Sequence, residues 1–353
     1  MNITEKYKEL NKSYSKNCVF HVGIDAGFFC EYSYMIEIMM YCLENNIQLR
    51  LYSQDSNFGF KDGWSDYFQP FCEEVHDKFH SYVNFHKRQT LSSIWNFRAE
   101  SESPTLKWKL KLDFYHLCGK IIKFFRNDIQ YFSQDIRAKI DFLNKNYSFP
   151  GLGFEGNYVE SFKLLDSIVW QFNSATRQAI NKIIEELSLP VGYISCQIRG
   201  GDKCIEHSLH SVDFYLENIK KISDIKNVFV LTDDYNVLKL LRSKAPEYNW
   251  FSFCESSENG YYNREFSKMN PVKKKEKMMR FFASIELLKN SELFLGTITS
   301  NPSRYIMCTN FEKSFFVDFS KLNFLSFFDM SRMDLRKEIE KNVSGFYLTK
   351  NLY

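Results

Sequence analysis

The sequence lacks the features that mark several classes of protein. None of its nine cysteines forms a C-x-x-C pair, so the spacing typical of zinc sites and thiol redox motifs is missing. No run of about 18 apolar residues occurs, and a membrane-spanning helix is not expected. The 46 basic and 43 acidic residues leave a net charge of only +3, which argues against a nucleic acid as partner.

The first sixteen residues are polar and contain no apolar signal core. The cysteines are scattered and odd in number, which favours free thiols in a reducing compartment. These two observations predict a cytoplasmic protein.

The composition is that of a folded protein. Hydrophobic residues make up 44% and charged residues 25% of the 353 residues, which excludes wholesale disorder. At roughly 150 residues per domain, the length suggests two domains. We expect an N-terminal α/β domain with a helical insertion over 1–188, a second α/β domain over 189–320, and a helical tail over 321–353 that packs back on the body.

The first half opens with a strand, a turn that contains glycine, a helix and a second strand. The apolar pattern predicts these elements at 17–22, 23–27, 31–45 and 47–52. Together they form a βαβ unit, although the glycine spacing in this turn does not match G-x-G-x-x-G. The stretch from 53 to 156 is less regular, with helices expected over 106–125 and 129–144. Further helices are expected over 160–170 and 175–187.

Strands and helices alternate regularly in the second half. Strands are predicted at 193–198, 227–231, 250–253, 293–296 and 314–317, and helices at 211–222, 235–243, 273–289 and 302–308. This alternation predicts a parallel, doubly wound sheet. Ligands bind such sheets beyond the carboxyl ends of the strands, so functional residues are expected just after Ile198, Leu231 and Gly296.

The first polar segment follows the strand that ends at Ile198. Arg199 can grip a phosphate through two parallel hydrogen bonds, and Lys203 offers a second positive charge. Gly200 and Gly201 allow close approach of a ligand to the backbone, and Asp202 can hold either cation. Glu206 and His207 are the nearest candidate proton acceptors. The alternative is a surface turn of mixed charge.

Two further segments follow the next strands. Asp233 and Asp234 can bind sugar hydroxyls or hold Arg199, or alternatively cap the following helix. Thr299 and Ser300 precede a helix that begins near Pro302, and such an N-terminus binds anions unless it is a simple hydroxyl cap. The occurrence of all three segments at one edge of the sheet favours a ligand that carries phosphate.

These segments resemble the α-1,6-fucosyltransferase family, which includes the bacterial nodulation-factor fucosyltransferases. The family motif H-x-R-R-x-D-K matches at Arg199, Asp202 and Lys203, whereas Gln197 replaces the His and Gly200 replaces the second Arg. Further matches are the T-D-D at 232–234, the Gly and Asn-Arg at Gly260, Asn263 and Arg264, and the S-S-x-x-x-R pattern at Thr299, Ser300 and Arg304.

The first half also resembles this family. Gly27 to Glu31 is similar to its G-Y-G-C-Q turn, and Gly63 to Pro70 is similar to its G-W-x-x-x-F-x-P stretch. The resemblance covers about 17–318, without a clear counterpart for 75–155.

The resemblance implies a GT-B-like fold with two Rossmann-like domains facing a cleft, and an inverting transfer of fucose from GDP-fucose without metal or cofactor. It implies donor binding by Gly27, Arg199, Asp202, Lys203, Asp233, Asp234, Arg264, Thr299, Ser300 and Arg304. The chain contains no Asp-x-Asp pair, which is the usual holder of metal and diphosphate in the other glycosyltransferase fold. Arg199, Lys203 and the helix at Asn301 would then stabilise the leaving diphosphate.

The base that takes the acceptor proton is Glu206 or His207. His207 lies at the family spacing from Lys203, and Glu206 lies one residue closer. Trp64 and Tyr67 are candidates for stacking on an acceptor sugar, with packing in the core as the alternative. The expected acceptor is an oligosaccharide or a lipid-linked glycan, such as a bacterial surface polysaccharide.

Several alternatives stay open. The protein could use another GDP-sugar, bind a nucleotide sugar without catalysis, or be a phosphatase or nuclease built on Asp233, Asp234 and His207. His76 and His80 have a spacing suited to zinc but lack the glutamate of a metalloprotease helix. The basic run 273–277 is either a solvated helix face or a contact with the inner membrane or a lipid diphosphate.

Overall fold

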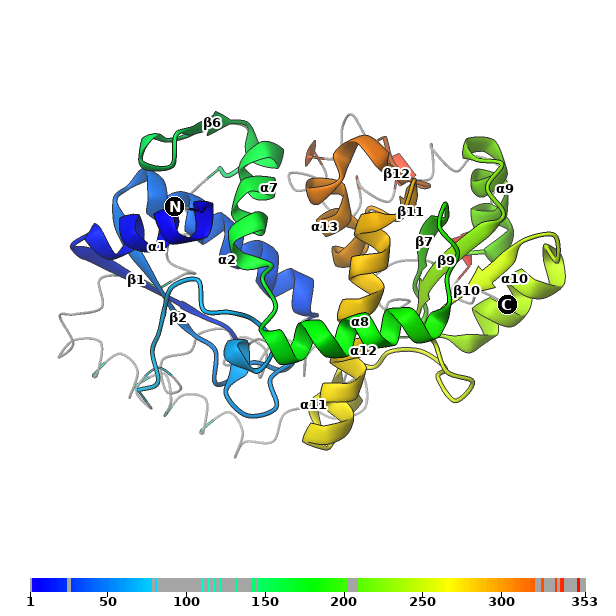
Figure 1. Cartoon of the computed structure of the whole chain (residues 1–353), viewed down its shortest axis with the longest axis horizontal. Helices are drawn as coiled ribbons and strands as arrows, with labels where there is room; N and C mark the ends of the chain where they lie inside the picture. Colours follow the sequence, from blue (N-terminus) through cyan, green and yellow to red (C-terminus); the bar gives the residue numbers. More distant parts are fainter. Residues whose placement is uncertain are drawn as a thin grey trace. The chain divides into compact units, whose positions relative to one another are not determined.

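The structure is a computed structural model, and it describes residues 2–23, 27–77, 80, 110, 114, 117, 121, 131–132, 141–143, 145–201, 209–320, 325–326, 334, 337–339 and 348–349. The chain packs as two compact units (Figure 1). Unit 1 comprises Met1–Thr176 and Ser267–Lys275, and unit 2 comprises Arg177–Phe266 and Glu276–Tyr353. Each unit contains a parallel sheet and helices, which confirms the α/β class.

Unit 1 is built on a four-stranded sheet with the order β3-β2-β1-β4. The strands are β1 (Lys16–His21), β2 (Ile47–Tyr52), β3 (Glu73–Glu74) and β4 (Tyr131–Phe132). Helix α2 (Phe28–Glu44) connects β1 to β2, and the two strands pair in parallel along their whole length. The βαβ unit predicted from the apolar pattern is therefore confirmed.

The prediction of a helix over 129–144 is wrong at Tyr131 and Phe132. These two residues form β4, which pairs in parallel with β1 through Cys18 and Val19. A strand of two residues has no period of its own that a sequence pattern could show. Pairing with the buried β1 sets its conformation, which is a tertiary effect.

The N-terminal segment forms helix α1 (Ile3–Ser13), which the sequence pattern did not predict. Asn2 and Glu5 form a capping box that satisfies backbone amides at its first turn. The side chain of Asn11 is buried, accepts from the amide of Leu49 at 2.8 Å and donates to its carbonyl at 2.9 Å. This pair of hydrogen bonds ties α1 to β2.

Further described elements of unit 1 pack against α1 and α2. A hairpin of β5 (Tyr147–Phe149) and β6 (Phe154–Gly156) flanks the one-turn helix η2 (Pro150–Leu152). Helix α7 (Tyr158–Val169) packs on α2, and η1 (Gly63–Asp66) follows β2. The Tyr32 hydroxyl donates to Asp166 at 2.7 Å, both side chains being buried, and links α2 to α7.

Unit 2 is built on a five-stranded parallel sheet with the order β10-β9-β7-β11-β12. The strands are β7 (Ile194–Ile198), β9 (Asn227–Thr232), β10 (Asn249–Phe251), β11 (Phe294–Gly296) and β12 (Ser314–Phe316). The helices between them are α9 (Val212–Ile222), α10 (Tyr235–Lys244), α11 (Asn263–Ser267), α12 (Pro271–Asn290) and α13 (Asn301–Thr309), followed by η4 (Phe311–Lys313). Numbered along the chain, the strand order is 3-2-1-4-5, the order of a doubly wound sheet.

The division between the units falls inside helix α8 (Ser174–Leu187) and inside α12. The boundary predicted at 188–189 coincides instead with the end of α8. Towards the C-terminus, β13 (Leu348–Thr349) pairs in antiparallel fashion with β8 (Leu209–His210). Within the described part of the chain, no helix combines the length and apolar character needed to cross a membrane.

Candidate functional site

The three polar segments predicted from the sequence follow neighbouring strands of unit 2. Arg199 follows β7, Asp233 follows β9, and Thr297 to Ser300 follow β11. Strand β7 lies between β9 and β11 in the sheet, so the three segments share its carboxyl edge. The strand order reverses between β7 and β11, which is where doubly wound sheets bind their ligands.

Asp233 organises the first two segments. Its carboxylate forms an ion pair with Arg199, accepts from the Gly200 amide at 2.7 Å and accepts from the Tyr261 amide at 2.8 Å. Its carbonyl accepts from the Gly260 amide at 2.7 Å. A carboxylate offers about four acceptor positions, and protein donors take three of these. This placement favours holding Arg199 over binding a sugar hydroxyl.

Arg199 is fixed before any ligand arrives. Its guanidinium also lies over the Tyr261 ring, 5.3 Å from the ring centroid. The Tyr261 hydroxyl donates to the buried Asn263 at 2.7 Å and so anchors the ring. The Arg199 side chain is 23% exposed, so a ligand can reach it. The Asp233 carboxylate and the Tyr261 ring hold its guanidinium in a fixed orientation.

Glycine is required where the loops after β7 and β10 meet. Gly201 has a φ of +55° and Gly260 a φ of +114°, values that favour glycine. A Cβ atom added to Gly201 would lie 2.5 Å from the backbone nitrogen and oxygen of Tyr261. The sequence predicts that Gly201 lets a ligand approach the backbone closely. In the structure, the group that approaches Gly201 is the backbone of Tyr261.

Asp234 caps helix α10, which was the alternative to binding a sugar hydroxyl. Its carboxylate accepts from the Asn236 amide at 2.9 Å at the start of α10, and the residue is 6% exposed. Its backbone also forms a bridge with Asn259. The two adjacent aspartates therefore do different work: Asp233 holds the cation, and Asp234 caps the helix.

Gln197 joins the two sides of the switch point. This buried side chain of β7 accepts at Oε1 from the Ser300 hydroxyl at 2.8 Å and from the Ser303 hydroxyl at 2.5 Å. Ser300 is the N-cap residue of α13, yet its side chain makes no capping hydrogen bond because it donates to Gln197. The simple hydroxyl cap is therefore not what Ser300 provides.

Arg304, in α13, stabilises the loop that precedes this helix. Its guanidinium donates to the Ile298 carbonyl at 2.9 Å and to the Asn301 side chain. Thr299 and Ser300 in the same loop are 9% and 3% exposed, so the loop offers mainly its backbone. Donor binding by these three residues stays a prediction.

A buried carboxylate supports this loop, and no sequence motif indicates it. Asp318, which is fully buried, accepts from the Ile298 amide at 2.9 Å and lies 3.1 Å from Nε2 of His210. Burial and the neighbouring Asp318 raise the pKa of Tyr215 well above its usual value. Asp318 comes after β12 and therefore reaches the site only through the fold of the sheet.

A second support is Glu258, in the loop that precedes Gly260. Burial alone would raise the pKa of its carboxyl. The hydrogen bond from the Glu255 amide and the nearby Lys277 and Arg280 outweigh that effect and lower it. The Glu258 carbonyl accepts from the Tyr235 amide at 2.8 Å. Glu258 thus connects the Gly260 loop to both α10 and α12.

Several predicted site residues lie outside the described residues. They are Asp202, Lys203, Glu206 and His207, together with the side chain of Arg264. The assignment of Lys203 to the diphosphate and the choice between Glu206 and His207 as base therefore stay predictions.

In unit 1, Trp64 and Tyr67 belong to an aromatic core. They are 2% and 0% exposed, and the Trp64 ring stacks on Phe68 with 4.2 Å between centroids. The Tyr67 hydroxyl donates to the Phe58 carbonyl at 3.1 Å. This placement favours the packing alternative over stacking on an acceptor sugar.

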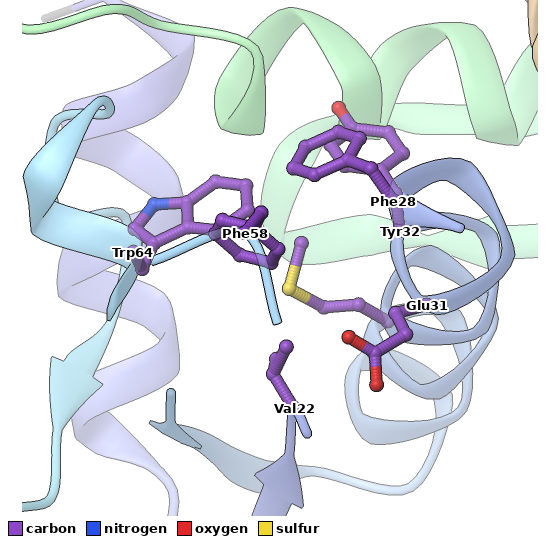
Figure 2. Close-up of a pocket in the computed structure, with 7 residues that line it drawn as sticks. Val22, Phe28, Glu31, Tyr32, Phe58 and Trp64 are labelled. Atoms are coloured by element: carbon purple, nitrogen blue, oxygen red, sulfur yellow. The ribbon is translucent and has the colours of Figure 1, made fainter. Parts of the chain in front are cut away.

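A small cavity lies in this core, beyond the carboxyl end of β1 (Figure 2). Its volume is about 10 Å³, and it is lined by Val22, Phe28, Glu31, Tyr32, Met35, Phe58 and Trp64. Glu31 is the one acidic residue of the lining and is 2% exposed. Its carboxylate accepts from the Gly23 amide at 2.9 Å and so fixes the chain where it leaves β1.

Gly27 is the N-cap residue of α2, and its φ of −65° is open to any residue. A Cβ atom there would meet nothing within 4 Å. The two histidines with zinc-like spacing have different partners: Nδ1 of His76 lies 3.1 Å from Gln54, and Nδ1 of His80 lies 3.0 Å from Nε2 of His21. Among the residues that the structure describes, no cluster of three or more metal-ligating side chains occurs.

No protein-family model and no curated protein matches the chain. Similar solved structures exist. The fucosyltransferase NodZ from Bradyrhizobium shows 13% identity over 83% of this chain and 92% of its own, with a TM-score of 0.45. A variant of FUT1 from Arabidopsis thaliana in complex with GDP shows 13% identity over 88% and 74%, with a TM-score of 0.49.

POFUT1 in complex with GDP-fucose shows 11% identity over 88% of this chain and 99% of its own, with a TM-score of 0.45. All three TM-scores lie below 0.5, and an assignment of activity therefore depends on the residues of this chain.

Proposed function

We propose that the chain is an inverting, metal-independent glycosyltransferase that moves fucose from GDP-fucose to a glycan acceptor, within a GT-B-like organisation of two Rossmann-like domains. One observation carries the proposal. Arg199 lies at the carboxyl end of β7, beside the switch point, already oriented by Asp233 and Tyr261. Its place in the H-x-R-R-x-D-K resemblance makes the diphosphate its ligand.

The chemistry assigned to these residues is a single displacement. The acceptor hydroxyl oxygen forms a bond to the anomeric carbon of the donor, and the bond from that carbon to the diphosphate oxygen breaks. The electron pair of the broken bond stays on GDP, and the hydroxyl proton passes to Glu206 or His207. Arg199 stabilises the charge that develops on the leaving diphosphate, because its guanidinium needs no reorganisation.

The site architecture supports this assignment over hydrolysis by paired aspartates. A phosphatase or nuclease built on Asp233 and Asp234 would need their carboxylates free to bind metal. Here Asp233 accepts from Arg199 and two backbone amides, and Asp234 accepts from the first turn of α10. Both carboxylates therefore form hydrogen bonds that stabilise the fold.

Titration calorimetry with GDP, GDP-fucose and GDP-mannose tests the binding step. We expect GDP and GDP-fucose to bind, Arg199→Ala to weaken both, and Arg242→Ala, an exposed arginine of the same unit, to leave binding unchanged. A chain that binds no guanine nucleotide contradicts the proposal.

Transfer to an array of oligosaccharide acceptors, read by product mass, tests the reaction. A product heavier by one fucose residue, formed equally well in excess chelator, is the expected result. A different mass increment would identify another GDP-sugar, and GDP binding without any product would identify a nucleotide-sugar-binding protein. Hydrolysis that chelator abolishes would identify a metal-dependent hydrolase.

A further inference from the structure

The turn from Thr297 to Ser300 connects β11 to α13 and is held by a set of hydrogen bonds. The Ser300 amide donates to the Thr297 carbonyl at 3.1 Å, which closes the turn. The Ile298 amide donates to Asp318 at 2.9 Å, and the Ile298 carbonyl accepts from Arg304 at 2.9 Å. The backbone of Ile298 is therefore fixed at both its donor and its acceptor.

This turn determines the direction in which α13 starts. The helix begins at Asn301, and helix geometry gives its first backbone amides no acceptor within the helix. The N-cap residue Ser300 makes no side-chain capping hydrogen bond, because its hydroxyl donates to Gln197. Amides of this kind bind anions such as phosphates. Their alignment with a phosphate depends on how precisely the preceding turn is held.

Asp318 is the buried anion that holds the turn. It is 0% exposed, and a carboxylate so deeply buried needs partners for its charge. One of its oxygens accepts from the Ile298 amide, and the other lies 3.1 Å from Nε2 of His210. Because each oxygen has its own partner, the carboxylate cannot rotate without losing one of them.

His210 presents a single nitrogen to Asp318. The residue is 6% exposed, and its Nδ1 atom is buried with no hydrogen-bond partner among the described residues. A ring proton is therefore best placed on Nε2, where the Asp318 carboxylate accepts it. His210 thus fixes the orientation of the carboxylate, which in turn fixes the Ile298 amide.

Tyr215, in α9, holds the first residue of the same turn. Its hydroxyl and the side chain of Thr297 form a hydrogen bond, and the two residues are 2% and 5% exposed. The ring of Tyr215 also lies beside that of His210, with 6.5 Å between centroids. Supports from three separate parts of unit 2 therefore meet at two successive residues, Thr297 and Ile298.

We propose that Asp318, oriented by His210 and assisted by Tyr215, is a positioning residue for the diphosphate of the donor. It fixes the Ile298 peptide and so aligns the first amides of α13 before the donor arrives. A turn that is already ordered loses less conformational entropy when the ligand binds. The inference rests on the proposed function, because it assigns the diphosphate to the start of α13.

Binding of GDP and of guanosine to the full chain tests the proposal, with calorimetry for GDP and NMR titration for guanosine. Asp318→Leu removes the acceptor and should weaken GDP binding about tenfold. It should leave guanosine binding unchanged, because guanosine carries no phosphate. Asp318→Asn keeps an oxygen that accepts from the Ile298 amide, and should bind GDP within about threefold of the unaltered chain.

A merely structural role predicts a different pattern. Equal losses for GDP and guanosine would show general destabilisation and overturn the proposal. An Asn variant as weak as the Leu variant would contradict the role given to the hydrogen bond with Ile298. Circular dichroism and melting temperature establish that each variant is folded.

Tyr215→Phe is the milder variant and carries the test if Asp318→Leu does not fold. It removes only the hydroxyl that pairs with Thr297, and should weaken GDP binding about threefold without affecting guanosine. The matched control is Ser291→Ala, which removes a buried hydrogen bond of 2.7 Å to Ser195, near the start of β7. The control should lower the melting temperature and bind GDP normally, and a loss of GDP binding as large as that of Asp318→Leu contradicts the proposal.

The unaltered chain separates this inference from the proposed function. If it binds no GDP, the proposed function fails and the inference fails with it. If it binds GDP, and both Asp318→Leu and Tyr215→Phe bind GDP equally well, the inference alone is overturned.

Discussion

The two parallel sheets share a strand order but not the chemistry at their carboxyl ends. Numbered along the chain, β3-β2-β1-β4 in unit 1 and the first four strands of unit 2 both follow the order 3-2-1-4. In unit 2 this edge holds Gln197 at the end of β7, Arg199 after β7 and Asp233 after β9. In unit 1 the described residues that line the cavity at the same position are aromatic and apolar side chains around one carboxylate, Glu31.

The strand order determines where the loops of a sheet come together. The side chains in those loops determine whether that place binds a ligand or packs as core. Unit 2 places hydrogen-bonded buried polar groups there, such as Gln197 with Ser300 and Asp318 with the Ile298 amide. Unit 1 relies on ring contacts such as Trp64 on Phe68 and Phe29 on Trp170. Changes at equivalent positions of the two units should therefore affect different properties.

The largest effect is expected from Trp64→Ala, which should destabilise unit 1 by about 3–5 kcal/mol because it empties a buried aromatic site. Hydrogen exchange read by mass spectrometry should show faster exchange in unit 1 peptides, with Trp64→Phe as the milder control. Normal protection together with lost sugar transfer would instead support acceptor stacking by Trp64.

In unit 2, Arg199→Ala should lower kcat/KM by about 100-fold, as the loss of one donor to a developing negative charge does. Melting temperature should change little, since the side chain is partly exposed. Arg199→Lys keeps the charge but loses the planar fork, and should recover only part of the rate. Near-normal transfer by Arg199→Ala would show that Arg199 does not stabilise the leaving diphosphate.

Gln197→Leu should destabilise unit 2 by about 1–3 kcal/mol, because the hydroxyls of Ser300 and Ser303 lose their common acceptor in a buried place. Gln197→His, which installs the residue of the family motif, keeps one acceptor nitrogen and should lose less. Denaturant unfolding measures both. Equal stability of all three proteins would show that these hydrogen bonds contribute nothing net.

Glu258 makes unit 2 sensitive to acid. Its pKa is lower in the folded protein than in the unfolded chain, so its contribution is present above the unfolded value near 4.3 and is lost as the pH falls through the folded value. At pH 7 Glu258→Gln should be less stable by about 1 kcal/mol, and this difference should shrink towards pH 3. Thermal unfolding across pH 3–7 checks it, and a constant difference contradicts it.

The smallest effect on stability is expected from Gly27→Ala in unit 1, within about 0.5 kcal/mol, because the backbone is extended and the added methyl group meets no atom. Gly201→Ala in unit 2 is the contrasting variant and should be clearly destabilising, because its methyl group meets backbone. If Gly27 approaches the donor, Gly27→Ala raises KM without changing the melting temperature.

The sequence was sufficient wherever long apolar strands and capped helices decide the structure. The strands β1, β2, β7 and β9 and the Ser211 cap of α9 lie where the patterns predict them. These elements form because local residues favour them, and a single window of sequence contains that information. The carboxyl edge that carries the candidate site follows directly from this alternation.

What the sequence could not supply depends on contacts between distant residues. Asp318 reaches the loop at Ile298, and Tyr261 reaches Asp233, only because the sheet brings their strands together. The burial of Trp64 depends in the same way on the rings of Phe28 and Tyr32, which α2 brings to it. A motif can identify such residues, but the fold decides whether a side chain faces a ligand or holds a neighbour.

The pairing of β8 with β13 has a consequence for the C-terminal tail. His210, in β8, holds Asp318, and Asp318 holds the Ile298 amide of the α13 loop. Leu348 is the register partner of His210. Truncation before residue 348 would therefore remove the backbone pairing of β13 with β8, the strand that carries His210 and, through Asp318, supports the loop at Ile298.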